Sequence, residues 1–317
     1  MKNWVFFIAP LGDILILYPI GDVFAFLPYK VSPRLSVHVW YHKVSYSGDF
    51  VSNSLINLEK STFCAFLSSL AYSTRDLIEE TAKCLDMEVD FFGNENHAFV
   101  LYNDKEVYLS FRGANSVKDF FIDGQAFKVH RSYGRVHNGF ADTFERLYPL
   151  ISKFKHFEST YGQAVLYGED RSKTIYVCGH SQGGAVAILC ARWFASNTKW
   201  DIKVYTYGQP RVGDWRWRRN YNRLKLEHYR FVHAQDIVTK VPRLGYWHVG
   251  TPIYINDKSE FVKRNPQGWR RFFLIPLLKG IEDQKIFKSY FEILSGKLGG
   301  PFLEGRVDRI SSILKEN

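Results

Sequence analysis

The stretch Thr174-Ile-Tyr-Val-Cys-Gly-His-Ser181-Gln-Gly-Gly-Ala-Val-Ala-Ile-Leu189 decides the fold of this chain. Residues 174–178 are β-branched and aromatic, which predicts a short buried strand. From Gln182 to Phe194 alanine, leucine and isoleucine dominate, a composition that favours a helix. Between the two lies a G-x-S-x-G turn, Gly179 to Gly183. So tight a reversal from strand to helix predicts a strained central serine with an exposed hydroxyl.

The residues around Ser181 predict a nucleophile. Glycine is needed two positions to either side because a Cβ there would collide with the neighbouring backbone. The backbone N–H of Gln182 is expected to point at the site from the start of the helix, where it can bind an oxyanion. The alternative interpretation is a glycine-rich turn with a chance serine, which the flanking strand and helix disfavour.

Composition indicates a globular protein with a strong positive charge. The 317 residues suffice for one large α/β domain with extensions or for two small domains, and 46% hydrophobic residues support a sizeable core. Aromatic residues make up 17%, which suits either contact with apolar ligands or an aromatic-rich core. The formal net charge of +10 predicts attraction to nucleic acid or to acidic lipid headgroups.

The cysteines and the N-terminal segment exclude some classes of protein. Cys64, Cys84, Cys178 and Cys190 have no C-x-x-C spacing, so we expect buried free thiols, no disulfide framework, no metal and no cofactor. The apolar segment 4–27 is interrupted by aspartates and prolines and has no small-residue cleavage site, so no signal peptide is recognised. The cytoplasm, export without a cleaved leader and membrane association all stay open as locations.

The sequence predicts three parts: an N-terminal extension that packs on the core (1–56), an α/β core (57–256) and a C-terminal extension that completes the fold (257–317). Helices are expected at 61–72, at 140–154 with a kink at Pro149, and at 283–298. Strands are expected at 35–41, 98–102, 107–111, 202–207 and 229–233. The apolar run 272–278 predicts either core packing or a membrane-facing element.

Five stretches together resemble the class 3 lipase family, the α/β-hydrolases related to fungal triacylglycerol lipases. They are Leu109–Ala114, Val136–Phe140, Gly179–Ala185, Tyr207–Asp214 and Asp236–Gly250. The resemblance implies an α/β-hydrolase fold with a mainly parallel central sheet, flanking helices and a short lid. It also implies hydrolysis of lipid esters, of the lipase or phospholipase A type, through an acyl-enzyme on a serine. The positive charge favours phospholipid over acylglycerol.

The resemblance assigns roles to individual residues. Ser181 matches the nucleophile, and Asp236 matches the triad acid that orients the base and stabilises its cation. Ala114 matches the position whose backbone N–H joins that of Gln182 in the oxyanion hole, although the family usually carries serine or threonine there. Residues 115–124, with two phenylalanines, match the lid. An aspartate in a turn after a strand is the alternative interpretation of Asp236.

The catalytic base departs from the family pattern. Arg309 stands where the family carries its catalytic histidine, and no histidine follows His248. Arginine stays protonated and has no acceptor, so it cannot act as the base. His248 lies near the expected site and is the alternative base, whereas His180 and His137 match structural positions. Two functions therefore remain open: a lipid-ester hydrolase, or a lipase-like binding or scaffolding protein with impaired turnover.

The stretch Arg211–Arg219 alternates basic and aromatic residues. No RNA- or DNA-binding signature accompanies it, which favours a solvated, positively charged helix. An anionic membrane surface is therefore the expected partner besides the lipid ester, nucleic acid is disfavoured, and the oligomeric state stays open.

Overall fold

The computed structural model describes residues 17–20, 23–26, 56–93, 97–114, 127–153, 174–233, 236, 238–256, 258–262, 290 and 294. Contacts divide the chain into two units, Met1–Tyr41 and His42–Asn317. In the first unit β1 (Leu17–Ile20) pairs antiparallel with β2 (Val23–Phe26). No helix in the described ranges is long and apolar enough to cross a membrane.

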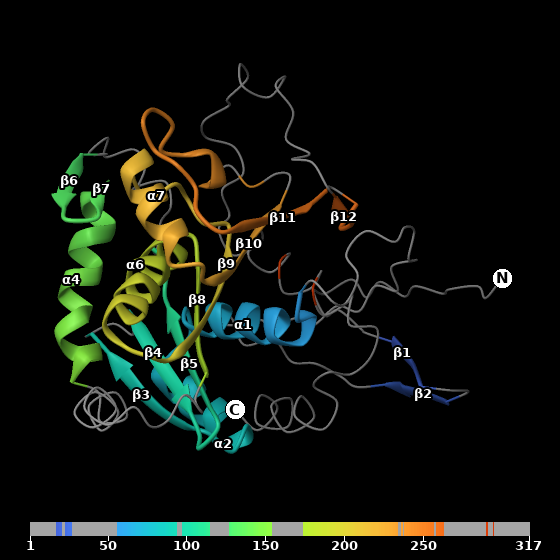
Figure 1. The fold of residues 1–317 in the computed structure, drawn as a ribbon. Coiled ribbons are helices and arrows are strands. Elements are labelled where there is room, and N and C mark those ends of the chain that lie inside the picture. Colours follow the sequence, from blue (N-terminus) through green and yellow to red (C-terminus); the bar gives the residue numbers. More distant parts are fainter. Residues whose placement is uncertain are drawn as a thin grey trace. The chain divides into compact units, whose positions relative to one another are not determined.

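An eight-stranded mixed sheet forms the centre of the second unit (Figure 1). Its strands are β3 (Glu88–Phe92), β4 (Ala98–Tyr102), β5 (Glu106–Phe111), β8 (Thr174–His180), β9 (Asp201–Tyr207), β10 (Glu227–His233), β11 (Thr251–Ile255) and β12 (Phe261–Val262). The order across the sheet is β12-β11-β10-β9-β8-β5-β4-β3. The neighbours from β5 to β11 are parallel, and the outer pairs are antiparallel. The predicted mainly parallel sheet is confirmed.

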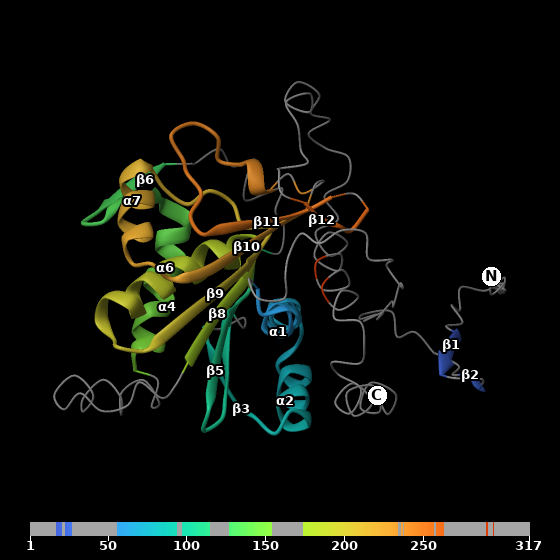
Figure 2. The ribbon, with the colours of Figure 1, turned by 45° about the vertical axis from the view of Figure 1, so that its right-hand side comes forward.

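Helices cover both faces of this sheet. They are α1 (Leu58–Leu70) and α2 (Arg75–Cys84) on one face, and α4 (Asn138–Ser152) and α6 (Gln182–Asn197) on the other (Figure 2). The hairpin of β6 (Lys128–Arg131) and β7 (Gly134–His137) and helix α7 (Trp215–Arg223) lie above α4 and α6 in the view of Figure 2. A short 3₁₀ helix, η1 (Val238–Lys240), follows β10. This layering of helix, sheet and helix is the predicted α/β-hydrolase architecture.

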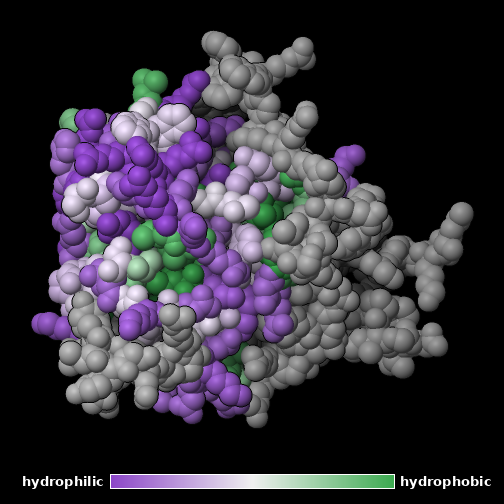
Figure 3. All heavy atoms as spheres, viewed as in Figure 1, coloured by the Kyte–Doolittle hydropathy of each residue, from purple (hydrophilic) through white to green (hydrophobic). Residues whose placement is uncertain are grey.

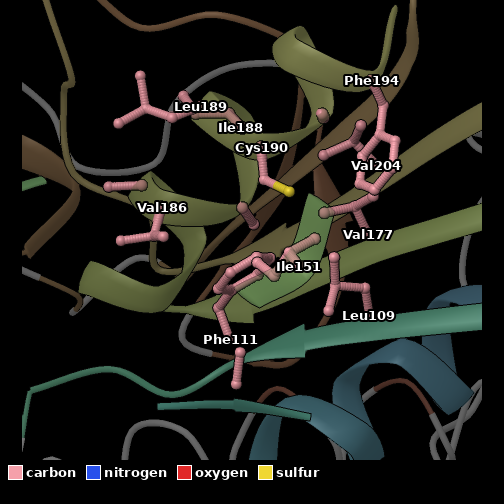
Figure 4. Packing of buried hydrophobic residues seen from close by; sticks show 14 of the residues in the cluster. Leu109, Phe111, Ile151, Val177, Val186, Ile188, Leu189, Cys190, Phe194 and Val204 are labelled. Atoms are coloured by element: carbon pink, nitrogen blue, oxygen red, sulfur yellow. The ribbon is translucent and has the colours of Figure 1, made fainter. Parts of the chain in front are cut away.

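Two hydrophobic clusters divide the sheet residues between its faces. In Figure 4 Val177 of β8 and Val204 of β9 lie against Phe194 of α6. Tyr176 and Cys178, which flank Val177, belong to the opposite cluster with α1. Successive side chains of a strand point to opposite faces, so β8 is buried on both sides. The continuous apolar run before Ser181 follows from this double burial.

Most predicted elements correspond to observed ones. The helices expected at 61–72 and 140–154 are α1 and α4, and Pro149 lies inside α4. The four cysteines are buried and free, as predicted. The strand expected at 35–41, the lid at 115–124, the run 272–278 and Arg309 lie outside the described residues. His248, the alternative base, lies in the loop before β11 (Thr251–Ile255).

Candidate active site

Ser181 occupies a strained position between β8 and α6. Its backbone has φ 53° and ψ −124°, in the left-handed region that serine rarely adopts. The strain is stabilised by the surrounding backbone, because the Ser181 N–H donates to the carbonyl oxygen of Tyr207 at 3.0 Å. The residue is only 2% exposed, which corrects the prediction of an exposed hydroxyl: the serine is covered.

The two glycines of the turn are required by close backbone approach. A Cβ on Gly179 would lie 2.5 Å from the carbonyl carbon of Gly183. A Cβ on Gly183 would lie 2.1 Å from the carbonyl oxygen of Phe111 at the end of β5. Contacts this short cannot be accommodated without moving the backbone. The turn is therefore fixed against β5 as well as against itself.

The two predicted oxyanion-hole residues leave neighbouring strands at the same edge of the sheet. Gln182 begins α6 just after β8, and Ala114 follows β5, which pairs with β8. The Ser181 side chain forms no capping hydrogen bond with α6. Its hydroxyl therefore does not occupy the first backbone N–H groups of that helix. A Cβ on Gly113 would lie 2.9 Å from the carbonyl oxygen of His180, so the segment carrying Ala114 passes beside the nucleophile turn.

Asp236 follows β10 at this edge and is 1% exposed. Its Oδ1 accepts a hydrogen bond from the backbone N–H of Val238 at 2.9 Å. Its Oδ2 accepts one from the hydroxyl of Tyr290 at 2.8 Å, and that hydroxyl in turn accepts from the backbone N–H of His233 at 2.8 Å. Tyr290 was missed in the sequence because it is one aromatic residue within a predicted helix, without a pattern that distinguishes it.

His180 and Asp236 meet at Gly208, which follows β9. Gly208 has φ +58°, and a Cβ there would lie 2.4 Å from Asp236 Oδ2 and 3.4 Å from His180 Nε2. The Nδ1 atom of His180 forms a hydrogen bond with the Tyr72 hydroxyl at 3.0 Å. Burial lowers the pKa of His180 to about 3, so its ring is neutral near pH 7 and is a very weak base. This geometry supports a structural role for His180.

His248 is hydrogen-bonded to a residue of η1, the short helix that follows β10. Its Nε2 donates to the carbonyl oxygen of Thr239 at 2.7 Å, and its buried Nδ1 has no hydrogen-bond partner in the described structure. Burial, together with the charge of Arg230, holds its pKa well below the usual value. In the described part of the chain no histidine is hydrogen-bonded to the Ser181 hydroxyl. His248 as the base stays a prediction that no observed contact supports.

Replacing Tyr290 by phenylalanine should lower the free energy of unfolding by about 2–3 kcal/mol. The substitution keeps the buried ring but removes a hydrogen bond to a buried carboxylate, and bonds to charged groups contribute about 1.5–3 kcal/mol. It also removes the acceptor of the His233 amide. Urea unfolding measures the difference in the free energy of unfolding. The control is Tyr148→Phe, at an exposed side chain of α4, which should change this free energy by less than about 0.5 kcal/mol. Equal effects of the two substitutions would contradict the prediction.

Comparisons with known proteins find similarity to lipases. Residues 108–246 match the family described as lipase (class 3). A lipase of Rhizomucor miehei is 29% identical over 171 residues, which cover 50% of this chain and 44% of the relative. The secreted mono- and diacylglycerol lipase A of Penicillium cyclopium is 31% identical over 163 residues, half of each chain. The chain thus spans half or less of the length of these curated relatives.

Solved structures show the same fold. The triacylglyceride lipase of Rhizomucor miehei superimposes with a TM-score of 0.53 at 26% identity, covering 65% of this chain and 82% of that one. A triacylglycerol lipase whose catalytic centre is described as a serine protease triad superimposes with a TM-score of 0.53 at 25% identity, covering 64% and 82%.

Proposed function

We propose that the chain is a serine lipid-ester hydrolase, starting from the match of residues 108–246 to the class 3 lipase family. The observation that carries the proposal is the strained position of Ser181, at the sheet edge where the buried Asp236 also lies. Backbone strain of this kind persists only where the surrounding structure enforces it, and it is concentrated at functional sites. A chance serine in a turn has no need of such a conformation.

In the proposed reaction the Ser181 hydroxyl attacks the ester carbonyl carbon and gives a tetrahedral intermediate with an oxyanion. The backbone N–H groups of Gln182 and Ala114 would stabilise that oxyanion. The carbon–oxygen bond to the leaving alcohol then breaks, the alcohol takes up the proton that the Ser181 hydroxyl gave up on attack, and the acyl group remains on Ser181. Water then hydrolyses the acyl-enzyme. Asp236 is the proposed acid that would orient and stabilise a protonated base.

The proposed substrate is a lipid ester, and phospholipid is favoured over acylglycerol. The relatives are named as lipases, and one is named for mono- and diacylglycerols. The net charge of +10 favours substrates that carry a negatively charged group. Phospholipids carry a phosphate, whereas acylglycerols are neutral. We propose residues 257–317 as the extension that completes this hydrolase and residues 1–56 as an extension ahead of it.

A second function, lipid binding or scaffolding with impaired turnover, is favoured by one observation. His248 is bonded to the Thr239 carbonyl rather than to Ser181. This agrees with the sequence, in which Arg309 stands at the position that the family resemblance assigns to the base. Oxyanion stabilisation and substrate binding alone still support a residual rate, about 10³–10⁴-fold over water in serine hydrolases that lack triad members. The two functions therefore differ in rate, and the same serine is the reactive group in both.

A fluorophosphonate probe tests the hydrolase proposal, because it needs an activated serine but no knowledge of the substrate. We expect covalent labelling of Ser181, identified by peptide mass spectrometry, and complete loss of labelling in Ser181→Ala. Ser196→Ala is the matched control, since Ser196 is exposed on α6 away from the turn. Labelling of folded protein at another residue, or none after long incubation, would overturn the enzymatic proposal and leave the fold intact.

A further inference from the structure

Helix α7 is anchored on one face and exposes a dense group of cations on the other. The Asp214 side chain caps it by accepting from the Trp217 N–H at 2.9 Å, and Trp217 and Tyr221 are buried beneath it. The opposite face carries its exposed side chains: Trp215, Arg216, Arg218, Arg219, Asn222 and Arg223. Figure 3 shows mainly hydrophilic residues over the side of the unit where α7 lies in Figure 1.

Two adjoining pockets open on this face. The first, of about 290 Å³, is lined by Ser132, Trp215, Arg216, Arg219, Asn220 and Arg223. Three guanidinium groups that meet polar side chains in one pocket suit a phosphate group, which arginine recognises through several parallel hydrogen bonds. The second, of about 330 Å³, is lined by Trp215, Arg218, Arg219, Asn222 and Trp247. Trp215 and Arg219 form the wall that the two pockets share.

The arginines of this face are not neutralised by carboxylates. In the described structure Arg216, Arg218, Arg219 and Arg223 form no ion pair. The neighbouring acidic residue, Asp214, is buried as the helix cap and pairs with Arg135. Like charges this close repel one another, so an anionic partner would relieve an existing electrostatic cost.

Large apolar side chains border the same cations. Trp215 is 59% exposed and Trp247 is 45% exposed, and the Arg218 guanidinium lies 5.3 Å from the centre of the Trp247 ring. Leu244, on the loop that leads to Trp247, is 89% exposed. Indole rings are enriched where a membrane meets water, with one side apolar and the other polar. An exposed leucine makes no favourable contact with the phosphate backbone of a nucleic acid, whereas it can be buried in the hydrocarbon of a membrane.

We infer that the α7 face is a docking surface for an anionic phospholipid membrane. Lipid phosphates bind in the arginine pocket, and Trp215, Trp247 and Leu244 enter the boundary between headgroups and acyl chains. The chain reaches α7 from the end of β9, the sheet edge at which Ser181 and Asp236 also lie. Docking does not depend on turnover at Ser181.

Vesicle co-sedimentation tests the inference, performed in a Ser181→Ala background so that no lipid is consumed. We expect binding to vesicles of phosphatidylcholine mixed with phosphatidylglycerol, weak binding to phosphatidylcholine alone, and loss of binding at high salt. Each arginine near such a surface contributes about 1 kcal/mol, so Arg216→Glu with Arg219→Glu should weaken binding at least about 30-fold. Trp215→Ala with Trp247→Ala should weaken it while leaving the salt dependence unchanged.

The matched control is Lys83→Glu with Lys199→Glu, which changes net charge equally at exposed positions of other elements. We expect the control to bind within about threefold of the parent protein. Arg216→Gln with Arg219→Gln repeats the test without introducing acidic groups, in case charge reversal disturbs folding. Equal loss in the control, or no preference for anionic vesicles, would overturn the inference. So would binding to RNA or DNA that the arginine substitutions abolish while vesicle binding persists.

Discussion

Arg309→His should raise the turnover of a short-chain ester by about 10²–10⁴-fold, the usual contribution of general-base assistance. Removing the proton from a serine hydroxyl near neutral pH requires an acceptor whose pKa is close to the working pH, and histidine meets this condition best. The expectation depends on the proposed hydrolase function and on the family resemblance that assigns Arg309 to the base position. Initial rates on a soluble ester, measured beside probe labelling of Ser181, give the result.

The structure gives the reason to expect a slow wild-type protein. The Nε2 of His248 donates to the Thr239 carbonyl, which leaves only the buried Nδ1 as an acceptor. Burial also keeps the pKa of His180 at about 3. A base so weak takes a proton poorly at neutral pH. His248→Asn, which retains a donor for the Thr239 carbonyl, should therefore change the rate little.

Arg306→His is the matched control, because it makes the same change three residues earlier in the chain. Free imidazole gives a second readout that does not depend on which residue holds the base position. It should accelerate the wild type at least about tenfold if the positioned base is absent. A fast wild type that His248→Asn slows by more than about 10²-fold would refute the Arg309 prediction and identify His248 as the base.

Local sequence patterns predicted those parts of the site whose structure depends on residues adjacent in the chain. The β-branched run before Ser181 and the alanine-rich run after it predicted β8, the turn and α6, because a doubly buried strand and a packed helix each need such residues. Gly179 and Gly183 were predicted from the same turn, and the close approaches of 2.5 Å and 2.1 Å explain them. Helical periodicity likewise accounts for the exposed face of α7.

Contacts between distant residues could not be predicted in this way. Tyr290 and Asp236 are 54 residues apart in the chain, and nothing in the spacing of either residue indicates the hydrogen bond between them. Whether a histidine near the site faces Ser181 or a backbone carbonyl depends on the path of one loop, as His248 illustrates. The covered state of Ser181 is also a property of packing, which a turn motif alone does not determine.

Acid should destabilise the fold steeply, because three histidines are buried in the neutral form. Burial lowers the pKa to about 3 for His180 and His228 and to about 4 for His137, and the charge of Arg230 adds to the effect at His228. In the unfolded chain their pKa is about 6.5. Below that value the unfolded state binds protons that the native state does not, so stability is fully present above about pH 6.5 and falls as pH falls towards the folded values.

Each such histidine contributes a slope of at most about 1.4 kcal/mol per pH unit in this window, so the three together contribute up to about 4 kcal/mol per unit. His248, whose pKa burial also holds well below the usual value, adds to the same slope. Urea unfolding at about pH 7, 6 and 5 measures the slope, and few carboxylates titrate there. His228→Gln should reduce it by up to about 1.4 kcal/mol per unit. In the described structure the His228 ring bonds the hydroxyls of Thr206 and Tyr221, which an amide can also bond. His130→Gln is the control, since His130 is exposed, and it should leave the slope unchanged. Stability that is flat from pH 7 to 5, or a slope that both substitutions alter equally, would show that the buried histidines do not govern acid unfolding.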